Sequence, residues 1–187
     1  MPTSSLLLTK FDVAERQLNQ AVRLFFSGGD EVSVHTLAEA SAQVLYDTRA
    51  QHGGGTSLIR DIDRIRPERR KEWLSYAHKS RNFFKHADRD AVETHEFKDV
   101  FNHFSLLDAV NLYLTAKKAW TPETLLFFGW FILTYPDLLK KDDHAFPAFV
   151  DQPFDPTNYS AIAACIDELR SGRRSLPGVT LELGLPA

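Results

Sequence analysis

The side chains best suited to chemistry lie in one six-residue segment, Arg-Asn-Phe-Phe-Lys-His at 81–86. Its polar residues are Arg81, Asn82, Lys85 and His86. A guanidinium can hold a phosphate through two parallel hydrogen bonds. An imidazole with an ordinary pKa can take up or release a proton near neutral pH. The pair therefore suits proton transfer at a phosphate group, a reaction that needs no metal ion when the substrate carries its own nucleophile.

A helical wheel at 100° per residue separates these polar residues from an apolar face on the same segment. The apolar face comprises Trp73, Tyr76, Ala77, Ser80, Phe83, Phe84 and Ala87. Asn82 is expected to point away from that face, and Arg81, Lys85 and His86 to fan across the same outer arc, with Arg81 and His86 about 140° apart. We therefore expect the polar set to be presented outward from a helical bundle.

The arginine, the polar residue directly after it and the histidine five positions on resemble the Arg-x(4–6)-His signature of the HEPN superfamily. The surroundings are similar too, since an amphipathic helix with small residues precedes the motif, around the stretch His-Thr-Leu-Ala-Glu-Ala at 35–40. The likeness covers roughly residues 31–118. It implies an all-α, up-and-down bundle with a four-helix core and additional C-terminal helices.

The resemblance also implies an activity, that of a metal-independent endoribonuclease, often a toxin or defence protein with an antitoxin partner. Two motifs would meet in one cleft of a homodimer, with His86 as general acid or base, Arg81 as the phosphate clamp and Asn82 as an orienting hydrogen-bonding group. Lys85 and Arg89 would bind substrate through their positive charge. RNA supplies its 2′-hydroxyl as nucleophile, so no cofactor or metal is expected. A non-catalytic module that binds a nucleotide or a partner protein is the alternative.

Two other interpretations follow from the residues themselves. The outer face of any amphipathic helix carries polar residues, so the motif is also compatible with a solvated surface. Four histidines at intervals of eight or nine residues, with aspartates between them, are candidate metal ligands: His78, His86, His95 and His103. Helical ligands usually lie three or four residues apart, so this spacing is poor for a metal site, although His95 and His103 could assist His86.

The elements that must position the motif are helices. Hydrophobic periodicity, caps and breakers predict helices over about 11–26, 31–51, 67–87, 96–118, 122–135 and 159–171. Thr9 and Asp12 form a capping-box pattern, and Thr121 followed by Pro122 is typical of a helix start. We expect a loop over 53–66 with room for a short helical turn, and a loop held by aromatic anchors over 141–158. The C-terminal tail after residue 176 is compatible with an extended arm, although its composition does not decide this.

Length and composition predict one domain over residues 1–187, with a HEPN-like core at about 31–118 and a C-terminal extension at about 119–187. The segment 60–90 holds ten Lys and Arg residues against six Asp and Glu residues, although the whole chain has a net charge of −3. An anionic ligand such as RNA or a nucleotide would therefore be drawn to the middle of the chain. A single cysteine, Cys165, and no long apolar run lead us to expect a cytoplasmic protein without a membrane span.

Overall fold

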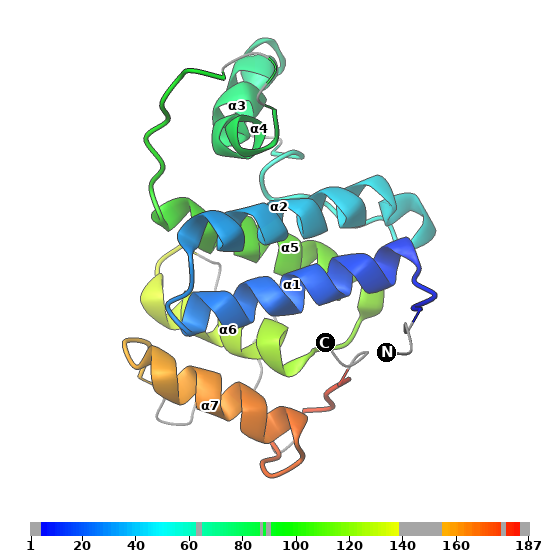
Figure 1. Cartoon of the computed structure of the whole chain (residues 1–187). Coiled ribbons are helices and arrows are strands. Elements are labelled where there is room, and N and C mark those ends of the chain that lie inside the picture. The colour runs from blue at the N-terminus through cyan, green and yellow to red at the C-terminus, as the bar shows by residue number, and fades with distance from the viewer. Residues whose placement is uncertain are drawn as a thin grey trace.

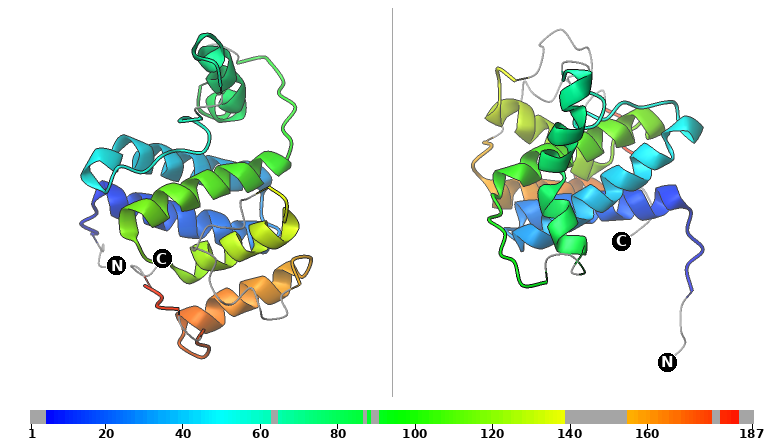
Figure 2. Two further views of the ribbon diagram at one scale, coloured as in Figure 1. Left: turned by 180° about the vertical axis from the view of Figure 1, so that it is seen from behind. Right: turned by 90° about the horizontal axis from the view of Figure 1, so that it is seen from above.

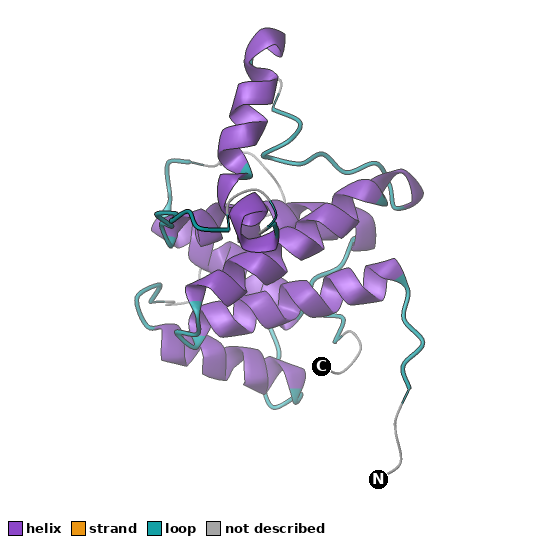
Figure 3. Cartoon of the chain, turned by 45° about the horizontal axis from the view of Figure 1, so that its top comes forward, coloured by secondary structure: helices purple, strands orange, loops and turns teal. Residues whose placement is uncertain are grey.

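The computed structural model describes residues 5–62, 65–86, 88, 91–138, 155–176 and 179–183. These residues form an all-α helical bundle, as the sequence predicts (Figure 1). The packed layer consists of five α-helices: α1 (Lys10–Phe26), α2 (Glu31–Asp47), α5 (Val100–Lys117), α6 (Pro122–Thr134) and α7 (Tyr159–Arg170). Coloured by secondary structure, the described part of the chain shows helices and loops only (Figure 3).

Helix α1 begins where its cap residues predict. Thr9 accepts a hydrogen bond from the backbone N–H of Asp12, while the Asp12 carboxylate accepts one from the backbone N–H of Thr9, so both halves of the capping box are present. Thr121 caps α6 in the same way, with Thr124 as its reciprocal partner and Pro122 in the first turn. Each helix start therefore satisfies backbone donors that have no partner within the helix.

One apolar core joins all five of these helices. It is formed by Leu18 and Val22 of α1, Ala38 of α2, Val110 of α5 and Phe131 of α6, together with neighbours that include Ile166 of α7. The small residues Ala38 and Ala42 on α2, with Ala14 and Ala21 on α1, let these two helices pack closely. The core does not divide at residue 118, because α6 and α7 share it with the earlier helices.

The segment that carries the motif lies outside this packed layer. It begins with the 3-10 helix η2 (Pro67–Arg69), continues as α3 (Arg70–Ala77) and ends as α4 (Lys79–Lys85). Seen from above, α3 and α4 cross over the bundle on the side of α2 and α5 (Figure 2). We refer to η2, α3 and α4 together as the arm.

The prediction of a single helix over 67–87 is wrong in one respect, because the helix is interrupted at His78, between α3 and α4. Its wheel is wrong as well: Tyr76, assigned to the core face, is 62% exposed, while Trp73, Phe83 and Phe84 are only partly buried. The helical wheel assumes a continuous helix pressed on a core, whereas the arm stands above the bundle and contacts it chiefly through α4 on α2. Ala87 lies outside the described residues.

The C-terminal segment lies against the bundle at several points: Leu176 is buried in the core, Val179 and Leu181 pack against it, and Glu182 pairs with Lys117 of α5 at 2.8 Å. Leu181 makes an isolated parallel bridge with Trp120, and the backbone N–H of Glu182 donates to the Trp120 carbonyl at 2.8 Å. The loop predicted over 141–158 falls almost wholly outside the described residues. Among the described residues, no helix has the length and apolar character needed to cross a membrane.

Candidate functional site

Helix α2 presents a polar stripe to α4. The stripe consists of His35, Glu39 and Gln43, which lie four residues apart and so share one face of the helix. Gln43 hydrogen-bonds to Arg81 of α4, and the His35 ring contacts the ring of Phe84 edge-to-face at 5.6 Å. The motif helix is therefore held against α2 by polar and aromatic contacts rather than by an aliphatic core.

Arg81 does not lie on the outer arc where the sequence places it. Its Nη1 donates to Gln43 Oε1 at 2.8 Å and its Nη2 to Asn82 Oδ1 at 3.4 Å. The side chain is half-buried, and this burial lowers the pKa of Arg81 from its usual value, while the Glu39 carboxylate acts in the opposite direction. The expectation that Arg81 faces outward is therefore wrong: its guanidinium is turned toward α2.

Gln43 is itself fixed by its neighbours. Its Nε2 donates to both carboxylate oxygens of Asp47 at 2.8 Å, so its Oε1 must face the other way. That oxygen accepts from Arg60 Nη2 at 3.2 Å as well as from Arg81. Two guanidiniums thus share one neutral acceptor, which orients Arg81 without neutralising it.

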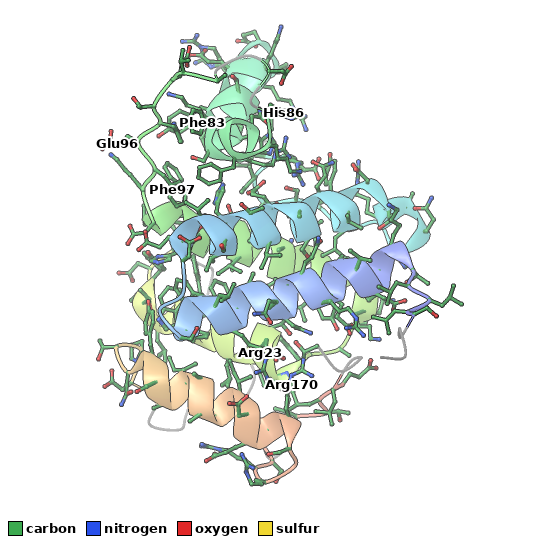
Figure 4. The ribbon with its side chains drawn as sticks, in the orientation of Figure 1. Arg23, Phe83, His86, Glu96, Phe97 and Arg170 are labelled. Atoms are coloured by element: carbon green, nitrogen blue, oxygen red, sulfur yellow. The ribbon has the colours of Figure 1, made fainter. Side chains whose placement is uncertain are left out.

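The remaining motif residues are exposed. Asn82 and Lys85 are in the last turns of α4, and His86 is its C-cap, with its backbone N–H donating to the Asn82 carbonyl at 3.0 Å. Figure 4 shows His86 on one side of α4 and Phe83 on the other, facing the segment that carries Glu96 and Phe97. Arg89 lies outside the described residues. Asn82 and Arg81 are in contact, whereas His86 is exposed to solvent, so the described residues of one chain do not form a closed site.

A buried polar layer lies beneath the arm, between α2 and α5. Ser105 of α5 donates to Glu39 at 2.7 Å, and Asn102 pairs with His35. Burial lowers the pKa of His35, although Glu39 opposes this effect. Burial and the nearby Arg81 lower the pKa of His78 to about 4. Both imidazoles are therefore neutral at neutral pH.

The histidines considered as metal ligands have separate partners. His95 Nε2 is 2.8 Å from Ser80 Oγ, beside α4. His103 Nδ1 is 2.6 Å from the hydroxyl of Tyr135, and its ring packs against Trp130. Of these two histidines, His95 therefore lies beside the motif helix, whereas His103 lies at Tyr135 and Trp130. Among the described residues, no group of three His, Cys, Asp or Glu side chains is placed to hold a metal ion.

The polar stripe has its own signal in the sequence, separate from the Arg81–His86 motif. His35, Glu39 and Gln43 recur every four residues within a helix otherwise rich in Ala and Val, a spacing that puts three polar groups on one otherwise apolar face. Comparison of the chain with known proteins identifies no relative. No protein-family model, curated protein or solved structure matches it.

Proposed function

We propose that the chain is a metal-independent endoribonuclease of HEPN type that acts as a homodimer. The observation that supports this most directly is the state of Arg81. Its two hydrogen bonds leave the Nε–H and one N–H on each terminal nitrogen without a partner in the described part of the chain. A guanidinium oriented by Gln43 and left with three donors is suited to bind a phosphate.

In this mechanism the 2′-hydroxyl of RNA attacks the adjacent phosphorus and the 5′-oxygen of the next nucleotide leaves. One group must take the 2′ proton and another must give a proton to the leaving oxygen, so the products are a 2′,3′-cyclic phosphate and a 5′-hydroxyl. Each chain supplies one exposed imidazole for this, His86. A homodimer supplies two, one as base and one as acid, while Arg81 stabilises the charge that develops on the phosphate oxygens.

Charge near α4 favours RNA as the ligand. The exposed Lys85 follows Asn82 by three residues and precedes His86 directly, so the solvent side of α4 carries cationic and hydrogen-bonding groups together. The electrostatic contribution of such groups to RNA affinity falls as salt rises. In a toxin–antitoxin arrangement the same surface would be the natural target for an antitoxin protein.

A second function, the non-catalytic module, is favoured by one specific observation. Arg81 is half-buried and shares its acceptor with the buried Arg60, an arrangement that also stabilises the attachment of α4 to α2. A nucleotide or a partner protein could bind the exposed side of α4 without any reaction. The two functions differ in product, because only the ribonuclease forms a cyclic phosphate.

The test is cleavage of a fluorescent single-stranded RNA in the presence of EDTA, with detection of the 2′,3′-cyclic phosphate. We expect wild type to cleave, and Arg81→Ala and His86→Ala each to lower the rate at least 100-fold. Arg69→Ala is the matched control, since it removes an exposed arginine of the same arm whose ion pair, within the described residues, is with Glu72. If wild type does not cleave, or both variants cleave as well as wild type, the catalytic proposal is wrong. Binding of RNA or a nucleotide without cleavage would support the module instead.

A further inference from the structure

A cavity of about 530 Å³ lies on the other side of the motif, under the arm. Its walls come from α3 and α4 above, α5 and His35 of α2 below, and the segment 58–62. Most of the lining is apolar and includes four aromatic rings: Trp73, Tyr76, Phe101 and Phe104. A cavity of this size and character is typical of a site for a small organic molecule.

His35 is a buried residue of the cavity wall, and it indicates that the cavity is more than a packing defect. Only 2% of its surface is exposed, and its Nδ1 lies 3.1 Å from Asn102 Oδ1. The orientation of the Asn102 amide is fixed independently, because its Nδ2 donates to the backbone carbonyl of Glu31 at 3.0 Å. The oxygen therefore faces His35, and an amide oxygen can only accept, so His35 Nδ1 carries the proton.

This assignment determines the chemistry of the other ring nitrogen. Burial keeps the His35 imidazole neutral by lowering its pKa, so Nε2 bears a lone pair and no proton. Nε2 is buried and has no hydrogen-bond partner. A buried acceptor without a donor is destabilising, and native proteins rarely leave one in that state.

The other polar groups buried at the cavity already have partners. The hydroxyl of Ser80 is bonded to His95, and the hydroxyl of Ser105 donates to Glu39. The charged residues Lys79, Glu96 and Lys98 also line the cavity, but they are exposed and reach solvent. Among the described lining residues, His35 thus carries the buried acceptor that has no partner, its Nε2.

We propose that this cavity binds a small, largely apolar, ring-containing molecule with one hydroxyl or N–H group that donates a hydrogen bond to His35 Nε2. The aromatic walls supply the apolar contacts for the ring. The lone pair supplies selectivity, because a ligand without a donor leaves the acceptor unsatisfied. The site is separate from Arg81 and His86, neither of which lines it, and it does not rest on the ribonuclease proposal.

The test uses two probes with the same rings, 2-naphthol and 2-methoxynaphthalene, and isothermal titration calorimetry on the full chain. Methylation removes the donor and changes little else. We expect 2-naphthol to bind about 5- to 10-fold more tightly, the selectivity of one hydrogen bond in a buried site. Equal affinity for the two probes, or binding of neither, would overturn the proposal; in the latter case a water molecule is the simpler partner for His35.

Variants locate the binding. His35→Leu removes the acceptor and should make the two affinities equal, while Ala77→Phe fills the cavity and should weaken both at least 10-fold. Ser75→Phe is the matched control: it adds the same ring on the same helix at an exposed position outside the lining and should change neither affinity. If His35→Leu keeps the preference for 2-naphthol, or Ala77→Phe binds as wild type does, the proposed site is wrong. Should His35→Leu fail to fold, the wild-type probe comparison and Ala77→Phe still decide the matter.

Discussion

Replacing Glu123 by glutamine should destabilise the protein strongly, although the change is nearly isosteric. Glu123 is completely buried in the first turn of α6, and its carboxylate is shared by two arginines. Arg23 of α1 donates to it through Nε at 2.8 Å, and Arg170 of α7 donates through Nε and Nη2. Figure 4 labels the two arginines beside each other, below α1 and close to α7. The carboxylate therefore links α1, α6 and α7.

The magnitude follows from what glutamine cannot do. Its oxygen, in the position of Oε1, can still accept from the Nε of both arginines, but its NH2 group then faces Nη2 of Arg170, so at least one charge-assisted hydrogen bond is lost and two cations remain close together without a countercharge. Removing one partner of a buried ion pair costs about 3–5 kcal/mol. Arg23 and Arg170 are 31% and 18% exposed, so water compensates in part, and we expect a loss of about 2–4 kcal/mol. For a chain of 187 residues that corresponds to a fall in Tm of about 5–10 °C.

Thermal and urea unfolding followed by circular dichroism measure this effect. Glu168→Gln is the matched control, since it removes a carboxylate of α7 that pairs with Arg174 at the surface, 3.6 Å away with both side chains 44% exposed. That change should cost less than about 1 kcal/mol. If Glu123→Gln lowers Tm by no more than Glu168→Gln does, the argument that the buried carboxylate holds α7 to the bundle is refuted.

Three further predictions concern single side chains. Burial raises the pKa of Asp108 to about 6, above the 3.8 of an unperturbed carboxyl, so the folded state binds this proton more tightly and the free energy of unfolding falls as pH rises from about 4 to 6. Wild type should therefore lose stability relative to Asp108→Asn between pH 4 and pH 7 in urea titrations, and a constant difference between the two proteins would contradict this. Gln43→Leu leaves the buried Arg60 and the half-buried Arg81 without their shared acceptor, so it should lower the free energy of unfolding by about 1–3 kcal/mol. An unchanged urea midpoint would show that the acceptor is dispensable. Lys118 ends α5 in the left-handed conformation with φ 56°, so Lys118→Gly should raise stability by about 0.5–1 kcal/mol in the same assay, and a loss would refute the strain argument.

The helices that build the core could be predicted because local sequence determines them. Thr9 and Thr121 mark helix starts through hydrogen bonds to residues three positions on, and those bonds need only residues that are close in sequence. Apolar spacing likewise identified the long helices, since their buried stripes face a common core. The predicted start of the fourth helix at 96 is four residues early: Glu96 to Asp99 approach α5 as extended chain and turn before the helix begins at Val100.

The arm could not be predicted because its geometry depends on contacts distant in sequence. No glycine or proline lies near the break at His78, and Tyr76 has the spacing of a core residue yet is exposed. Arg81 turns toward α2 because Gln43, 38 residues earlier, offers an oriented acceptor there. A helical wheel records the angles between side chains of one helix, but which side meets the rest of the protein is decided by the neighbouring helix.

The two faces of α4 have different neighbours, and this lets the two proposals fail separately. Ser80 lines the cavity, while the next residue, Arg81, lies on the α2 side and outside the cavity lining. Arg81→Ala should therefore lower the rate of RNA cleavage at least 100-fold and leave the preference for 2-naphthol intact. Ala77→Phe should weaken the binding of both probes and leave the rate of cleavage unchanged. If either variant removes both properties while the chain remains folded, the two sites are coupled through α4 and cannot be treated as independent.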